Sequence, residues 1–98
     1  MEKHEFNYPS ANRRVTGRSH VGVAGSGDME LLMEPSDKGE AHVLILTSVN
    51  GFGDAWKAVL DRFFSKHDGA VRIDINDGGA TPGIVMLRLE QAMEALEK

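Results

Sequence analysis

The fold of this chain is decided by the stretch Val43-Leu44-Ile45-Leu46-Thr47-Ser48-Val49-Asn50-Gly51-Phe52-Gly53-Asp54-Ala55-Trp56, because its periodicity changes midway. Val43 to Thr47 is a continuous apolar run, typical of a strand buried on both faces and therefore internal to a sheet. After Asn50 the apolar residues recur at spacings of one, three and four, which is the pattern of one helix face. That face comprises Ala55, Trp56, Val59, Leu60, Phe63 and Phe64. The switch predicts a strand and then a helix, with Gly51-Phe52-Gly53 as the turn and Phe52 packed on the core.

Downstream of this helix the sequence predicts one more strand and one more helix. Gly69 ends the first helix. Val71, Ile73 and Ile75 then alternate with polar residues, which indicates a strand parallel to the one at Val43. Thr81-Pro82 is a helix start, with threonine as the cap and proline in the first turn. The buried stripe of this second helix is Val85, Leu89, Ala92 and Leu96.

Upstream, two strands are expected around a glycine turn. One strand covers Val15 to Val23 and the other Met29 to Glu34, with Met29, Leu31 and Met33 on one face. Gly25-Ser26-Gly27-Asp28 lies between them and suits a hairpin tip, since glycine tolerates positive φ. A second turn at Pro35 to Glu40 leads to Val43. The alternation at Glu5 to Tyr8 is short and leaves a further strand open.

These elements predict an α+β fold with two layers. The sheet is expected to be mixed and four-stranded, an antiparallel meander plus one crossover strand, with two helices on one face. Trp56, Phe63, Val85 and Leu89 are expected in the core. The length predicts one domain, residues 1–98.

Composition excludes several functional classes. A net charge of -4 is unsuited to nucleic acid, which requires a basic surface, and gives no attraction to anionic membranes. No stretch is apolar enough to span a bilayer, and Met1 to Pro9 lacks the apolar region of a signal peptide, so we expect a cytoplasmic protein. There are no cysteines, hence no disulfides and no thiolate chemistry. The four histidines lack metal-ligand spacing, so no metal site is expected.

Three segments carry a more specific signal. They are Val23-Ala24-Gly25-Ser26-Gly27-Asp28-Met29-Glu30, Ser48 to Trp56, and Ile75-Asn76-Asp77-Gly78-Gly79-Ala80-Thr81-Pro82-Gly83. In this order and spacing, together with Leu60 to Phe64 and Val85 to Leu89, the chain resembles the acyl carrier (delta) subunit family of malonate decarboxylase. The resemblance runs from about Phe6 to Leu89.

The resemblance implies a carrier without catalytic residues of its own. Ser26 would be the covalent attachment point of a phosphoribosyl-dephospho-CoA prosthetic group, with Gly25, Gly27 and Asp28 as its flanking site residues. The thiol of that group would carry acetyl and malonyl thioesters. The implied partners are an acetyl-CoA:malonate acyl carrier transferase subunit, the decarboxylase subunits and a prosthetic-group transferase.

Alternative interpretations stay open at this point. The chain also fits a citrate lyase-type acyl carrier, or a small α+β binding or regulatory module whose glycine turns are only turns. A small hydrolase using Ser26 with His20 would need an oxyanion hole and an orienting acid as well. Asp74 to Gly79 suggests a calcium loop but lacks required ligands, which favours a strand-to-helix turn.

Overall fold

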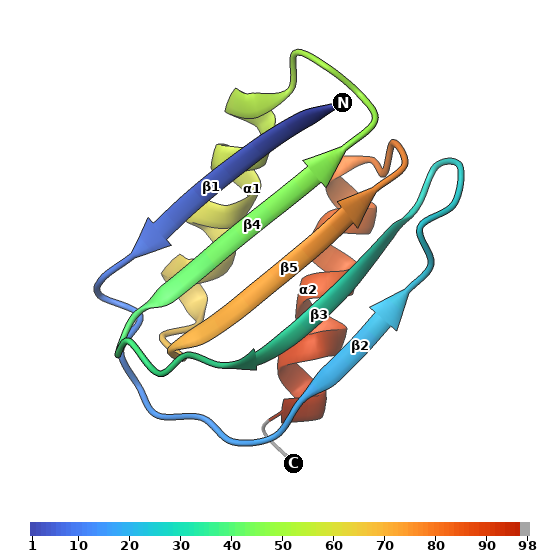
Figure 1. Ribbon diagram of the computed structural model, residues 1–98. Helices are drawn as coiled ribbons and strands as arrows, with labels where there is room; N and C mark the ends of the chain where they lie inside the picture. Colours follow the sequence, from blue (N-terminus) through green and yellow to red (C-terminus); the bar gives the residue numbers. More distant parts are fainter. Residues whose placement is uncertain (97–98) are drawn as a thin grey trace.

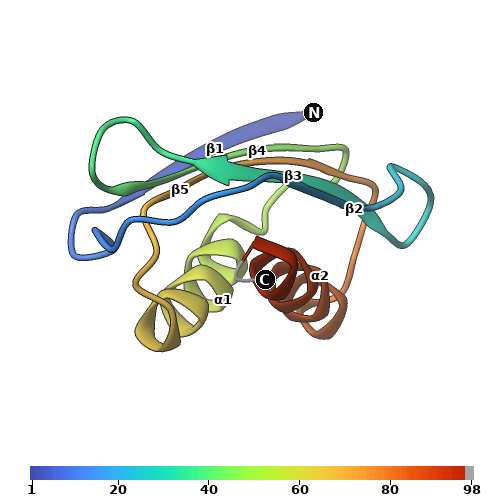
Figure 2. The same ribbon diagram turned by 90° about the horizontal axis from the view of Figure 1, so that it is seen from below.

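A five-stranded mixed sheet forms one layer of the protein, and two helices cover one of its faces (Figure 1, Figure 2). The structure is a computed structural model that describes residues 1–96. The last two residues of the predicted domain, 97 and 98, lie outside the described residues. The elements are β1 Glu2–Tyr8, β2 Ser19–Gly22, β3 Met29–Pro35, β4 Ala41–Thr47, α1 Gly53–Lys66, β5 Val71–Asp77 and α2 Pro82–Leu96.

The order of the strands across the sheet is β1-β4-β5-β3-β2. β4 and β5 are parallel, as predicted, and the other neighbouring pairs are antiparallel. The prediction of four strands was wrong because β1 adds a fifth, pairing with β4 from Glu2↔Thr47 to Tyr8↔Ala41. The predicted meander was also wrong, because β5 lies between β3 and β4. Among the strands of residues 1–96, β2 and β3 are the one antiparallel pair that is consecutive in the chain and adjacent in the sheet.

The strand predicted from Val15 to Val23 is shorter than expected. Only Ser19–Gly22 pairs with a neighbour, although the side chain of Val15 is buried. Gly17, two positions before β2, and Gly22, its last residue, have positive φ of 91° and 79°, so the extended strand cannot continue beyond either glycine. The alternation from Val15 to Val23 correctly indicated that Val15 and Ser19 face the core, but the strand predicted from it was too long.

The core lies between the sheet and the helices, and its predicted members are confirmed. Trp56, Phe63, Val85 and Leu89 are all buried. They pack with the alternate residues of the three inner strands, among them Leu31, Met33, Val43, Ile45, Ile73 and Ile75.

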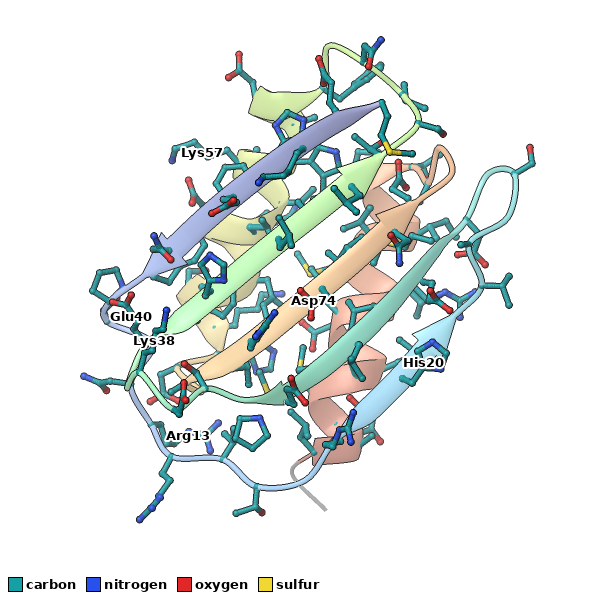
Figure 3. The ribbon with its side chains drawn as sticks, in the orientation of Figure 1. Arg13, His20, Lys38, Glu40, Lys57 and Asp74 are labelled. Atoms are coloured by element: carbon teal, nitrogen blue, oxygen red, sulfur yellow. The ribbon has the colours of Figure 1, made fainter. Side chains whose placement is uncertain are left out.

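β4 is internal as predicted, but it is not buried on both faces. Leu44 and Leu46 are only half-buried, because helices cover one face of the sheet alone. The open face is mostly polar, with His20 of β2 and Asp74 of β5 standing on it (Figure 3). Among the described residues, no helix is long and apolar enough to cross a membrane.

Candidate functional site

The three segments singled out in the sequence meet at one end of the sheet. Because β4 and β5 are parallel, the loops that follow them emerge at the same end, where the tip of the β2–β3 hairpin also lies (Figure 1). The Ser48 N–H donates to the Asp77 carbonyl at 3.1 Å, and the Gly27 N–H donates to the Gly78 carbonyl at 3.0 Å. The Gly78 N–H in turn donates to the Asp28 carbonyl at 2.9 Å. We call residues 23–28 the serine loop.

Ser26 occupies the tip of a tight turn within the serine loop. The Asp28 N–H donates to the Gly25 carbonyl at 3.1 Å, and Gly27 has a φ of 76°. A positive φ at the third residue of such a turn is the mark of type II, which favours glycine there. A Cβ atom at Gly27 would meet nothing within 4 Å, so the space beside Ser26 is open. The serine hydroxyl is thus presented to solvent on a turn of defined shape.

Asp28 fixes the serine loop to α2. Its carboxylate accepts hydrogen bonds from Arg88 Nη2 at 2.7 Å and Arg88 Nε at 3.2 Å, and a third from the Met29 N–H at 2.7 Å. The hydrogen bonds from Arg88 are the main reason that the pKa of Asp28 lies below its usual value. The sequence placed Asp28 among the site residues, and the structure uses its side chain to anchor the loop.

Arg88 is the site residue that sequence reasoning missed. It lies in the Val85 to Leu89 segment that carried part of the resemblance, but nothing in its spacing ties it to Asp28. The two residues are 60 positions apart in the chain and meet only through the packing of α2 against β2 and β3.

The turn after β5 forms the platform on which the serine loop rests. A Cβ atom at Gly78 would lie 2.3 Å from the Gly25 carbonyl oxygen, so only glycine allows this approach. Asp77, which is buried, accepts hydrogen bonds from Thr47 Oγ1 at 2.8 Å and from the Gly79 and Ala80 N–H groups at 3.1 and 2.9 Å. The predicted strand-to-helix turn is confirmed, because β5 ends at Asp77 and α2 begins at Pro82. The Asp77 carboxylate accepts hydrogen bonds from the backbone of this turn. The Thr81 hydroxyl accepts from the Ile84 N–H at 3.4 Å and caps α2 as predicted.

The surroundings of Ser26 do not form a hydrolase centre. Within residues 1–96, no hydrogen bond to the Ser26 hydroxyl is found, and His20 binds Glu30 at 3.0 Å on the open face of the sheet. A nucleophilic serine requires a base within hydrogen-bond reach. The Ser26 hydroxyl is exposed and stands between two glycines.

The four histidines lie apart from one another, and each pairs with a different glutamate. Each of the four lies within 3.6 Å of a glutamate carboxylate, in the pairs His4–Glu2, His20–Glu30, His42–Glu5 and His67–Glu90. In the part of the chain that the structure describes, no three His, Asp or Glu side chains converge as metal ligands.

Fold and site together define a small α+β protein that presents one serine at the tip of an anchored glycine turn. Residues 16–96 match the model of the family described as malonate decarboxylase delta subunit. The chain belongs to this family.

Individual relatives agree with the family assignment. The chain is 44% identical over 95 residues to the malonate decarboxylase acyl carrier protein of Azotobacter vinelandii, covering 96% of this chain and 95% of that protein. It is 46% identical over 97 residues to the protein of that name from Pseudomonas savastanoi pv. phaseolicola, covering 98% of this chain and 97% of the relative.

A solved structure has the same fold. It is a chain from the crystal structure of a Pseudomonas malonate decarboxylase hetero-tetramer in complex with malonate, at a TM-score of 0.91 and 43% identity. The match covers 98% of this chain and 99% of that chain. The two curated relatives are acyl carrier proteins by name.

Proposed function

We propose that this chain is the acyl carrier subunit of a malonate decarboxylase and that Ser26 carries its prosthetic group. The observation that carries the proposal is the free, exposed hydroxyl of Ser26 on a turn whose shape is fixed by Gly27 and by the Asp28–Arg88 contact. Family membership supplies the role, and the names of the relatives supply the substrate, malonate.

The group that we assign to Ser26 is phosphoribosyl-dephospho-CoA, bound through a phosphodiester. When bound, it supplies a terminal thiol that holds acyl groups as thioesters, which a chain without cysteine cannot supply itself. Gly25 and Gly27 leave the hydroxyl accessible to a transferase, while Asp28 acts through Arg88 to hold the loop in place.

This role requires three kinds of partner. A prosthetic-group transferase must reach Ser26, an acetyl-CoA:malonate acyl carrier transferase must load malonate, and the decarboxylase subunits must remove carbon dioxide. The hetero-tetramer that contains the matched chain supports the existence of decarboxylase partners. A tether raises the local concentration of the acyl group at each partner's site without adding new contacts.

The proposal is tested by mass. The chain is co-expressed with the prosthetic-group transferase system and weighed intact. Wild type should gain the mass of the group, and Ser26→Ala should keep its bare sequence mass while shifting stability by less than about 0.5 kcal/mol, as exposed positions usually do.

Ser48→Ala is the matched control, because Ser48 is also exposed and lies at the same end of the sheet. It should be modified fully. A full gain of mass on the Ser26→Ala protein would place the attachment elsewhere. An unmodified wild-type chain would instead favour the binding-module alternative.

A further inference from the structure

An apolar hollow of about 150 Å³ lies between the first turns of the two helices. Its lining contains no charged side chain and consists of Phe52, Ala55, Trp56, Val59, Pro82 and Val85. The sequence predicted that Phe52 would pack on the core, but its side chain is 54% exposed at the edge of this hollow. Trp56 is the first buried side chain of α1, and Phe52 precedes the helix as its N-cap residue. A large aromatic side chain left in water beside an apolar hollow indicates a binding surface.

The hollow lies at the same end of the molecule as the serine loop. The residue that contacts the serine loop, Gly78, is four positions before Pro82 in the hollow. Consecutive Cα atoms are about 3.8 Å apart, so at most about 15 Å separates these two residues. Gly79 also lies against Val49, in the loop that leads to Phe52. A flexible group of a phosphoribose, an adenosine, a diphosphate and a pantetheine in series is long enough to reach from Ser26 to the hollow.

The apolar lining of the hollow distinguishes the two acyl groups proposed for the arm, acetyl and malonyl. A malonyl group ends in a carboxylate, and removing an ionised carboxylate from water without a partner is costly. Among the side chains that line the hollow, none is charged, and the indole N–H of Trp56 is the only polar group, so no lining side chain compensates the charge of a carboxylate. An acetyl group is small and neutral, and apolar surface favours its burial.

We propose that this hollow binds the acetyl-bearing end of the arm and rejects the malonyl-bearing end. The inference rests on the function proposed above. The charge of the acyl group then decides where the end of the arm lies. The acetyl thioester is sheltered from water between cycles, whereas the malonyl thioester stays in solvent, where the decarboxylase subunits can take it.

Trp56 is the only tryptophan of the chain and lines the hollow, so its fluorescence reports occupancy. The protein is first weighed to establish that Ser26 carries the arm, and its emission is then compared in the thiol, acetyl and malonyl states. We expect the acetyl state alone to shift the emission to shorter wavelength and to reduce quenching by acrylamide. The malonyl state should match the thiol state.

Ala55→Leu should fill the hollow and remove the difference between the acetyl and thiol states of that variant. It should also speed hydrolysis of the acetyl thioester in water. Ala58→Leu is the matched control, because Ala58 is exposed on the same helix and does not line the hollow. It should behave like wild type. Should Ala55→Leu fold poorly, a nuclear Overhauser effect between a ¹³C-labelled acetyl methyl group and the Trp56 indole tests the same contact in wild type.

The outcomes separate the two proposals. A wild-type chain without the arm overturns both. A modified chain with the same Trp56 emission in all three states, or with a change that appears only when partner subunits are added, overturns the binding of the acetyl group and leaves the carrier function standing.

Discussion

At the scale of single residues, Gly27 combines a backbone requirement with a functional position. Its φ of 76° lies in the region that side chains with a Cβ rarely adopt, and it is next to the proposed attachment point. Gly39 has a similar φ of 69° and equally open surroundings, but it lies in the turn between β3 and β4. Figure 3 shows its neighbours Lys38 and Glu40 at the opposite end of the sheet from the serine loop.

Valine variants of these two glycines distinguish the effect of backbone strain from the effect of crowding beside Ser26. Gly27→Val and Gly39→Val should each lose about 1–2 kcal/mol of stability, the usual cost of a left-handed conformation. Only Gly27→Val should also slow transfer of the prosthetic group, because the added methyl groups crowd Ser26. Urea unfolding measures the first effect and the time course of intact mass the second. Equal transfer rates for the two variants would contradict the assignment of Gly27 to the site.

Residue-scale patterns predicted the turns at the candidate site better than they predicted the contacts that support these turns. The glycines around Ser26 and the capped turn at Thr81 are local features with known backbone geometry, and the structure has both. The Arg88–Asp28 contact and the approach of Gly78 to Gly25 are not local. They arise when α2 and β5 pack beside the β2–β3 hairpin, and no spacing in the sequence encodes that.

At the scale of elements, the Asp28–Arg88 contact ties the β2–β3 hairpin to α2. Arg88→Met keeps the unbranched apolar stem of the side chain but removes the guanidinium group and both of its hydrogen bonds to Asp28. The amides of Gly27 and Met29 should then exchange several-fold faster with deuterium, relative to an unstructured reference. Arg62→Met, on the exposed face of α1, is the control and should leave these amides unchanged.

The same contact predicts a pH dependence. Because the pKa of Asp28 is lowered in the folded protein, its contribution is fully present above the ordinary aspartate value of about 3.9. It is lost as pH falls through the lower, folded-state pKa. The exchange difference between wild type and Arg88→Met should therefore be constant near neutral pH and shrink below about pH 4. A difference that persisted at pH 2 would show that the carboxylate is not the partner that matters.

Strand order was the part of the fold that element-level patterns could not supply. β3, β4, β5 and both helices were predicted close to their observed positions, because each has a clear pattern. β3 and β5 alternate, β4 is a continuous apolar run, and the helices repeat their apolar residues at spacings of three and four. β1 was left open, since the alternation recognised at Glu5 to Tyr8 is short. Its charged residues Glu2, Lys3 and Glu5 suit the edge strand that the structure shows. With β1 on one side of β4 and β5 on the other, no edge of β4 remains for β3, and the meander cannot form.

At the scale of the whole molecule, the architecture favours presentation over catalysis. Every element of the site serves to hold one loop outside the sheet, from the Asp77 hydrogen bonds below it to the Arg88 contact beside it. The one apolar hollow discussed above lacks an acid, a base or a hydrogen-bond donor in its lining side chains apart from the indole of Trp56. Decarboxylation needs positioned donors where negative charge develops, and the proposed carrier role assigns these to the decarboxylase subunits.

The isolated chain, with or without its prosthetic group, should release no carbon dioxide from malonate above the buffer rate, because the proposed carrier role leaves the donors that stabilise the developing charge to the partner subunits. Adding the decarboxylase and transferase subunits should restore turnover for wild type and Ser48→Ala, but not for Ser26→Ala. Release of labelled carbon dioxide from carboxyl-labelled malonate measures this directly. Turnover by the modified chain alone would show that the catalytic groups lie within these 98 residues, and the carrier assignment would then fail.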